Sequence, residues 1–540
     1  MRKIDIIFIS SALLAAIAVT GAHLLDPKNT ISPENSITYE FPETKYGAFL
    51  AAQHAVYVND FDAATKFVNH LGSIDYPIVQ NTKYLAEFLG GKMPDNAKLL
   101  KNEKSMPAQM IYDAYLVQND SWKELHNRHK SDESAIIAPL RIWSAIANNW
   151  RTNTFKFIDR LPTNQSWKSF VRGQIYAELG DTKQAAEHFE KVSADFMYLN
   201  DYLYLMSFFT HHDMIDKADN LHQDFTSKPG GMFLAGYDKI PDWSVYSGLK
   251  NALAFSLVQN VSHTQIMMYS DLSLLMLRFA ESIAPDFANN NNTVDYYLGQ
   301  FFYNNTGKYE PLFKKINPES PFFLFANLRL AQKSGDIKSL EKALKKYPLF
   351  VPAINQLIAH HIKNGNKRAA LRVINQALDD ENLNDAGRAF FTKSRAQVYF
   401  VFGDLDDAQK DIRNASDILM VDAEIVSLQA KIWAKQNREI EAAYEYAMTL
   451  VRQNPSDVLA WDTLGYVVAT REGADAAIEI LERVGEISDT CSSLFEQLGD
   501  LYAEQGDVIK ARKAYMRAID LSDDGLTVVP VVERKIRKLK

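Results

Sequence analysis

Two segments near the carboxyl end of this 540-residue chain match each other at a constant spacing. Residues 460–484 and 494–518 carry the same classes of residue at positions that differ by 34 throughout. A repeated unit of this length buries its apolar face only against a neighbouring copy, so several copies must stack side by side. The spacing therefore predicts an array of repeated units rather than a sandwich or a barrel.

The matched positions combine small and large side chains in the way that two packed helices require. Gly465 and Gly499 are small where one helix approaches its partner, and Ala477 and Ala511 are small where the second helix crosses it. This pattern resembles the tetratricopeptide repeat, in which a pair of antiparallel helices forms each unit. The resemblance implies an all-α fold, a right-handed solenoid of helix pairs. The large matched positions are Trp461, Phe495 and Tyr515.

Weaker matches extend this pattern upstream, so that it covers the chain from about residue 45 to residue 522. The chain has only 23 Gly and 18 Pro, fewer than an average protein of this length, which favours long helices with short turns. Interruptions at 228–241 and 285–293 break the repeat phase, and residues 197–330 are rich in Tyr, Phe and Met. This region is either a set of degenerate helix pairs or a junction between two stacks.

We therefore divide the body into three parts. Helical repeats are expected over 45–228, and an array with an irregular start over 240–525. The last part, 526–540, is expected to be a short helix, since it ends in a basic amphipathic stretch. This helix either caps the open end of the array or contacts an anionic membrane or another polyanion.

Residues 1–25 have the layout of an export signal. Arg2 and Lys3 precede a stretch without charge from Ile6 to Ala22, whose last residues are small enough for cleavage. We expect either a cleaved signal peptide or an inner-membrane anchor that tethers the protein through residues 4–25; a buried helix is the third possibility. Residues 26–44 contain Pro, Asn, Ser and Thr and predict a linker. The location indicated is a bacterial periplasm or the periplasmic side of the inner membrane.

Composition excludes several classes of function. Acidic residues exceed basic ones, 67 to 59, so the chain has no overall electrostatic signature of nucleic-acid binding. The single cysteine, Cys491, excludes intramolecular disulfides and cysteine-rich zinc sites. No metalloprotease, nucleophile-elbow, dinucleotide-binding or phosphate-loop motif is present in the sequence. We therefore expect no catalytic residue, no cofactor and no metal.

Histidines form the only groupings that resemble a ligand set. His211 and His212 precede Asp213, with His222 nearby, and His126 and His129 are three residues apart on one helix face. The first group lies at a probable helix end and the second in a polar stretch, so we interpret both as solvated, and a metal site near residue 211 is the alternative.

The resemblance to tetratricopeptide repeats also implies a binding surface. In that family the first helix of each pair lines a concave groove, and its positions 2, 5, 9 and 12 face a protein or peptide ligand. The aromatic members of this set could instead pack on neighbouring repeats. The groove positions that we infer are Phe390, Lys393, Gln397, Phe400, Lys435, Asp462 and Tyr466.

The order of segments in the chain resembles exported tetratricopeptide-repeat proteins of alphaproteobacteria. It has a tether, a first repeat that opens with Gly-Ala-Phe-Leu-Ala-Ala, an irregular middle, two regular repeats and a basic end. This resemblance implies a non-catalytic scaffold or adaptor that binds other envelope proteins. The alternatives are an enzyme with a site in the irregular middle and a glycan- or peptidoglycan-binding module. The glycan module would use Trp243, Tyr246, Tyr296 and Tyr297.

Overall fold

The computed structural model describes residues 44–71, 76–235, 237–263, 271–305, 308–419 and 422–539. Within these ranges the secondary structure consists of α-helices and short 3-10 helices, with no strand, so the predicted all-α fold is confirmed. The chain divides into two compact units, one up to Lys83 and one from Tyr84. The boundary that we expect between 228 and 240 stays a prediction.

The first unit is a helix pair followed by the start of a third helix. α2 begins after Thr44, whose side chain accepts a hydrogen bond from the Gly47 N–H at 3.0 Å. Ala48, Ala52 and Ala55 share the buried face of α2, and such small residues allow the close contact with α3. The helices are α2 (Lys45–Tyr57), α3 (Phe61–His70) and α4 (Pro77–Leu89), and α4 continues across the division.

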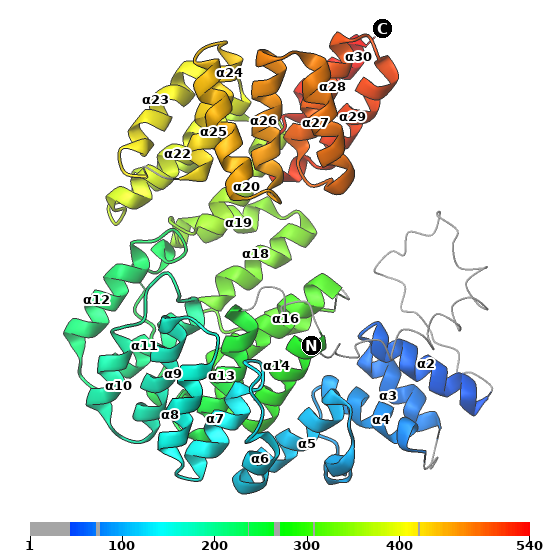
Figure 1. The fold of residues 1–540 in the computed structure, drawn as a ribbon, viewed down its shortest axis with the longest axis vertical. Coiled ribbons are helices and arrows are strands. Elements are labelled where there is room, and N and C mark those ends of the chain that lie inside the picture. Colours follow the sequence, from blue (N-terminus) through cyan, green and yellow to red (C-terminus); the bar gives the residue numbers. More distant parts are fainter. Residues whose placement is uncertain are drawn as a thin grey trace. The chain divides into compact units, whose positions relative to one another are not determined.

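The second unit begins with a body of helices from residue 97 to residue 315, which we call the middle body (Figure 1). Its elements are η2 (Ala97–Asn102), α5 (Met106–Gln118), α6 (Trp122–His129), α7 (Ala138–Ala147), α8 (Arg151–Arg160), α9 (Gln165–Glu178), α10 (Thr182–Phe189), α11 (Leu199–His211), α12 (Ile215–Thr226), η3 (Met232–Leu234), η4 (Trp243–Val245), α13 (Leu249–His263), α14 (Asp271–Ile283), α15 (Pro285–Asn291), α16 (Thr293–Asn305) and α17 (Glu310–Lys315).

Helices far apart in sequence pack against each other in the middle body. α5 contacts α14, and α7 contacts α13. The indole N–H of Trp143 donates to the Ser256 hydroxyl at 2.9 Å, deep in the interior. This part of the chain therefore does not follow the rule of a simple solenoid, in which a unit contacts only its neighbours.

Aromatic rings fill the centre of the middle body. Tyr204 is fully buried, and its ring centroid lies 4.6 Å from that of Phe255, 5.0 Å from that of Tyr246 and 5.2 Å from that of Trp243. Tyr297 is also buried, and Tyr296 packs against Phe322 at 5.2 Å. The interpretation of Trp243, Tyr246, Tyr296 and Tyr297 as an exposed sugar-binding line is therefore wrong, because three of these rings are buried in the core and Tyr296 is half-buried against Phe322.

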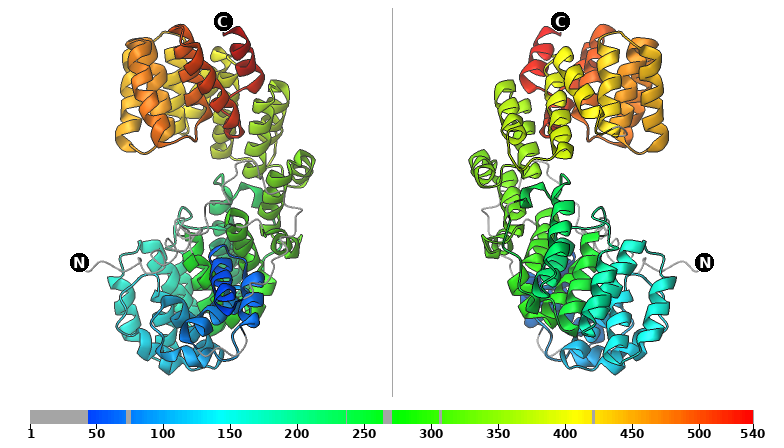
Figure 2. Two further views of the ribbon diagram at one scale, coloured as in Figure 1. Left: turned by 90° about the vertical axis from the view of Figure 1, so that its right-hand side faces the viewer. Right: turned by 90° about the vertical axis from the view of Figure 1, so that its left-hand side faces the viewer.

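The remaining helices form a series of antiparallel pairs that we call the C-terminal array, and Figure 2 shows these pairs side by side in both views. Its helices are α18 (Phe322–Ser334), α19 (Ile337–Lys346), α20 (Val351–Lys363), α21 (Lys367–Leu378), α22 (Asp385–Val401), α23 (Leu405–Ser416), α24 (Ala423–Lys435), α25 (Ile440–Gln453), α26 (Val458–Arg471), α27 (Ala474–Ile487), α28 (Ser492–Glu504), α29 (Val508–Asp520), η6 (Ser522–Asp524) and α30 (Val529–Lys538).

The repeat residues have the packing roles that the sequence predicts. A Cβ atom on Gly499 would lie 2.3 Å from the Tyr515 ring, and one on Gly465 would lie 2.5 Å from Leu481. At the turn between α28 and α29, Gly506 has a φ of +79°, which glycine adopts without strain. The side chain of the next residue, Asp507, accepts a hydrogen bond from the Lys510 N–H at 3.0 Å and so begins α29.

The end of the chain packs back onto the array. Val532 of α30 is fully buried, and Lys535 pairs with Glu496 of α28 at 2.8 Å. η6 contacts α20, where Lys363 pairs with Asp523 at 2.7 Å. The last part of the array therefore touches α20, near the start of the array.

The expected signal or anchor at 1–25 lies outside the described residues, as does the linker at 26–44 except for Thr44. Within the described ranges, none of the helices combines the length and hydropathy needed to cross a bilayer.

Candidate protein-binding face

The first helices of successive pairs lie next to one another in the C-terminal array. α24 contacts both α22 and α26, and α26 also contacts α28 (Figure 1). We call the surface that α22, α24, α26 and α28 share the first-helix face. All seven of the groove residues predicted from the sequence belong to three of these helices.

Two of the predicted residues are buried in ion pairs that join neighbouring repeats. Lys393 of α22 contacts Asp422 at 2.8 Å and Glu424 at 2.7 Å, and only 7% of its surface is exposed. Asp462 of α26 is fully buried and pairs with Lys431 of α24 at 2.6 Å. Buried charges are stable only when they are paired and hydrogen-bonded, so these two residues hold the stack together and are not open to a ligand.

The centre of the first-helix face is a cation between two aromatic rings. The Nζ atom of Lys435, at the end of α24, lies 4.7 Å from the Phe400 ring centroid and 5.1 Å from that of Tyr466. The two rings belong to α22 and α26 and meet edge to face, with their centroids 6.1 Å apart. The three side chains therefore connect three successive repeats, and we call them the Lys435 cluster.

Lys435 is exposed to solvent, and no ion pair is found for it within the described ranges. The helices around it still displace water, and this burial lowers the pKa of its ammonium group. Burial also raises the pKa of the Tyr466 phenol well above its ordinary value, so Tyr466 stays neutral. The cluster thus offers an accessible positive charge beside the half-buried ring of Tyr466, which suits an acidic or carbonyl group next to apolar side chains.

The other predicted residues flank this cluster. Gln397 is half-buried on α22, one helical turn before Phe400. Phe400 itself is only 4% exposed, so its contribution is the edge of a ring rather than a free side chain. Phe390 is half-buried against the core of α20–α22, and Lys393 Nζ lies 5.4 Å from its ring centroid. Most of the surface of Phe390 and Phe400 is therefore packed against neighbouring helices, as the alternative interpretation of the aromatic residues expects.

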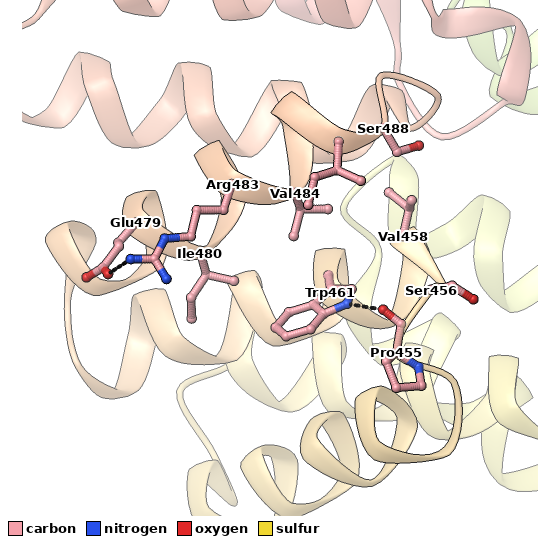
Figure 3. Close-up of a pocket in the computed structure, with 10 residues that line it drawn as sticks. Pro455, Ser456, Val458, Trp461, Glu479, Ile480, Arg483, Val484 and Ser488 are labelled. Atoms are coloured by element: carbon pink, nitrogen blue, oxygen red, sulfur yellow. Dashed lines mark hydrogen bonds and ion pairs between the residues drawn. The ribbon is translucent and has the colours of Figure 1, made fainter.

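A second feature of the array is an apolar cleft of about 380 Å³ beside Trp461 (Figure 3). The Trp461 indole N–H donates to the Pro455 carbonyl at 2.9 Å, and this bond fixes the ring as one wall. Ile480, Val484 and Ile487 of α27 line the other side, and Ile487 is 88% exposed. The sequence interpretation used Trp461 only for packing and missed the cleft, although these three residues share one helix face.

The histidine groupings differ in their surroundings. In the part of the chain that the structure describes, no three His, Cys, Asp or Glu side chains are arranged so that they could hold an ion. His129 is buried and contacts the Asp113 carboxylate at 2.8 Å, and His126 is also buried. The expectation of a solvated face at His126 and His129 is therefore wrong, because Asp113 of the preceding helix draws this side of α6 into the interior.

Cys491 is buried in the core of the array, at the start of α28. Burial raises the pKa of its thiol to about 12, so the reactive thiolate is scarce near neutral pH.

The architecture defines a protein built from stacked antiparallel helix pairs. A family model described as "Tetratricopeptide repeat" matches residues 170–193, on α9 and α10, and residues 492–524, on α28 and α29. The chain therefore contains tetratricopeptide repeats, one matched in the middle body and one in the array.

Comparisons with other proteins add little beyond this assignment. Among solved structures, 115 chains match, including "Crystal structure of APC/C hetero-tetramer Cut9-Hcn1". That match has 12% identity, covers 92% of this chain and 96% of the other, and has a TM-score of 0.33. "Crystal Structure of the Yeast Tom70" matches with 13% identity, coverage of 91% and 95%, and a TM-score of 0.24. No curated protein matches the sequence. The assignment rests on the family model and on the helix pairs.

Proposed function

We propose that this protein is a non-catalytic scaffold or adaptor that binds a protein partner on the first-helix face of its C-terminal array. The observation that carries the proposal is the Lys435 cluster, an exposed unpaired cation between Phe400 and Tyr466. Tetratricopeptide repeats are typically protein-interaction modules, which supports a scaffold. The preferred ligand is an extended segment or a helix with an acidic side chain flanked by apolar ones.

A site-specific crosslinking experiment tests this proposal. A photo-reactive phenylalanine at Gln397 would report contacts beside the cluster, in the full-length protein and in its own cell envelope. Lys435→Glu reverses the charge of the cluster, and we expect it to reduce the crosslinked partner by about tenfold, equal to about 1.4 kcal/mol. Lys410→Glu is the matched control, since Lys410 is also exposed and lies on α23, the second helix of its pair.

Two outcomes would contradict the proposal. One is that Lys435→Glu and Lys410→Glu capture the same proteins in equal amounts. The other is that position 397 captures no protein while the chain binds cell-wall glycan saturably, which would favour the glycan-binding alternative on a surface other than the buried central rings.

We also propose that the protein acts in the periplasm, either free or tethered to the inner membrane through residues 4–25. The support is the sequence of residues 1–25, with Arg2 and Lys3 ahead of an uncharged stretch. The test is protease accessibility: the body should be digested in spheroplasts and protected in intact cells. Protection in spheroplasts that is lost only on lysis would place the body in the cytoplasm instead. Retention in the membrane fraction would separate the anchor from the cleaved signal.

A further inference from the structure

A basic pocket lies in the middle body, away from the first-helix face. It is a cavity of about 320 Å³ formed by the end of α6, by α7 and by one face of α8 along its whole length. Its polar and aromatic lining includes His126, Lys130, Arg141, Trp150, Lys156 and Arg160. The volume is within the usual range for small-molecule sites.

The lining of the basic pocket contains four permanent cations and no carboxylate. One acid, Glu133, pairs with two of them, Arg141 at 3.4 Å and Arg160 at 3.3 Å. The exposed ammonium groups of Lys130 and Lys156 have no ion pair within the described ranges. In a chain whose formal net charge is −8, this pocket is a local excess of positive charge that a ligand with two negative charges would balance.

A buried histidine adds an unused polar atom to this pocket. His126 is only 9% exposed, and its Nδ1 contacts the Ser144 hydroxyl at 3.4 Å. Its Nε2 has no hydrogen-bond partner in the part of the chain that the structure describes. Burial, and then the charges of Arg141 and Lys130, lower the pKa of His126. The positive field that these residues create is the same field that would attract an anion.

Helix α8 lines the pocket along one face, from its first turn to its last residue. The lining residues of α8 are Asn153, Thr154, Lys156, Phe157 and Arg160. Asn153 is exposed, so its side-chain amide can donate a hydrogen bond to an anion beside Lys156.

One aromatic ring of the pocket is open. The Trp150 residue is 41% exposed and is held by an edge-to-face contact with His126, whose ring centroid lies 4.2 Å away. The other ring, Phe157, is covered by the Arg141 guanidinium at 3.8 Å from its centroid. Trp150 can therefore stack on a flat ring that lies next to the anion.

We propose that the basic pocket binds a small organic phosphate, a doubly charged phosphate carried next to a flat ring. The phosphate lies among Lys130, Lys156 and the side-chain amide of Asn153, and the ring stacks on Trp150. Lys130 and Lys156 supply positive charge that no ion pair within the described ranges neutralises. The basic pocket is separate from the first-helix face. This proposal therefore does not depend on whether a protein partner binds to that face.

Calorimetric titration of the full chain tests this proposal, with phenyl phosphate as the probe. We expect saturable binding at low ionic strength, weakened by added salt. The double variant Lys130→Ala/Lys156→Ala should lower the affinity by about tenfold or more. The matched control Lys98→Ala/Lys123→Ala removes two other exposed, unpaired lysines and should leave the affinity within about twofold.

The variant Trp150→Ala tests the stacking of the probe's ring separately from the binding of its phosphate. It should weaken phenyl phosphate while leaving inorganic phosphate unchanged. The proposal is overturned if phenyl phosphate does not bind, if both double variants weaken it equally, or if an acidic peptide binds the pocket and phenyl phosphate does not displace it. Unchanged far-UV circular dichroism of each variant shows that lost binding does not come from lost folding.

Discussion

The C-terminal array and the middle body are built from the same kind of helix pair but are held together differently. In the array, α22 to α28 contact mainly the next helix or the next but one in sequence. In the middle body, α5 packs on α14 and α7 on α13, so helices from distant parts of the sequence pack directly on each other. The difference shows that one repeat can serve both a nearly one-dimensional stack and a body with long-range contacts.

Removing one phenylalanine from each core would test this contrast most strongly. Phe255 in the middle body and Phe391 in the array are both almost fully buried. Replacing either by Ala should cost about 3–5 kcal/mol of local stability, because a large cavity is left. In hydrogen exchange followed by mass spectrometry, Phe255→Ala should reduce the protection of α5 to α16 together. Phe391→Ala should affect mainly α20, α21 and α22, with the segments around Met232 and Val528 that pack on the same cluster. If the loss of protection extended over equally many helices in both variants, the proposed difference between the middle body and the array would be wrong.

A smaller effect should show that the local helix pair is the same in both regions. A Cβ on Gly173 would lie 2.3 Å from the Phe189 ring, and one on Gly499 would lie 2.3 Å from the Tyr515 ring. Gly173→Ala and Gly499→Ala should each cost about 1–3 kcal/mol in urea unfolding, since a buried ring must move. Gly230→Ala is the control, because nothing lies within 4 Å of its added Cβ, and it should cause no loss. A harmless Gly173→Ala would mean that the pair at α9 and α10 packs more loosely than that at α28 and α29.

The smallest expected effect concerns a carboxylate of the middle body. Glu178 of α9 accepts the Gly248 N–H at 2.9 Å, at the start of α13. Burial raises its pKa from 4.5 to about 7, although the hydrogen bond from Gly248 acts in the opposite direction. Because the folded pKa is the higher one, the stability that this group contributes is fully present below pH 4.5 and is lost as the pH rises to about 7.

Glu178→Gln imitates the protonated group, so it should match the wild type in stability near pH 4.5 and exceed it near pH 7. Urea midpoints across this range measure the difference. An equal pH dependence of the two proteins would show that Glu178 does not titrate in this window. Glu482 in the array is the opposite case, because the hydrogen bond from Tyr502 lowers its pKa. Glu482→Gln should therefore be less stable than the wild type near pH 7.

The sequence predicts the array well because its determinants are local. Gly499 and Tyr515 lie sixteen residues apart and touch, and the same holds for Gly465 and Leu481, so each pair can be found from one stretch of sequence. The turn at Gly506 and Asp507 is equally local. The all-α fold and the helix pairs follow from such positions.

The parts that could not be predicted depend on contacts between distant residues. Trp143 and Ser256 are joined by a hydrogen bond across more than one hundred residues, and nothing local marks either one. Tyr246 is typical of an exposed sugar-stacking residue in isolation, but Tyr204 and Phe255 bury it. In the candidate site, Asp462 is spaced like a groove residue and is buried because Lys431 of the preceding first helix pairs with it. The basic pocket was missed for the same reason, since Lys130 and Lys156 come from separate helices.

The burial of Cys491 makes its rate of thiol labelling a measure of local opening in the array. Its thiol is the only one in the chain, so any reaction with a thiol reagent reports on one position. Because the side chain is only 3% exposed and packs with the residues of α26 to α28, the reaction must wait for these helices to separate. The rate of labelling therefore measures how often this end of the array opens. A partner that holds α26 and α28 together would lower the rate of Cys491 labelling in proportion to its occupancy.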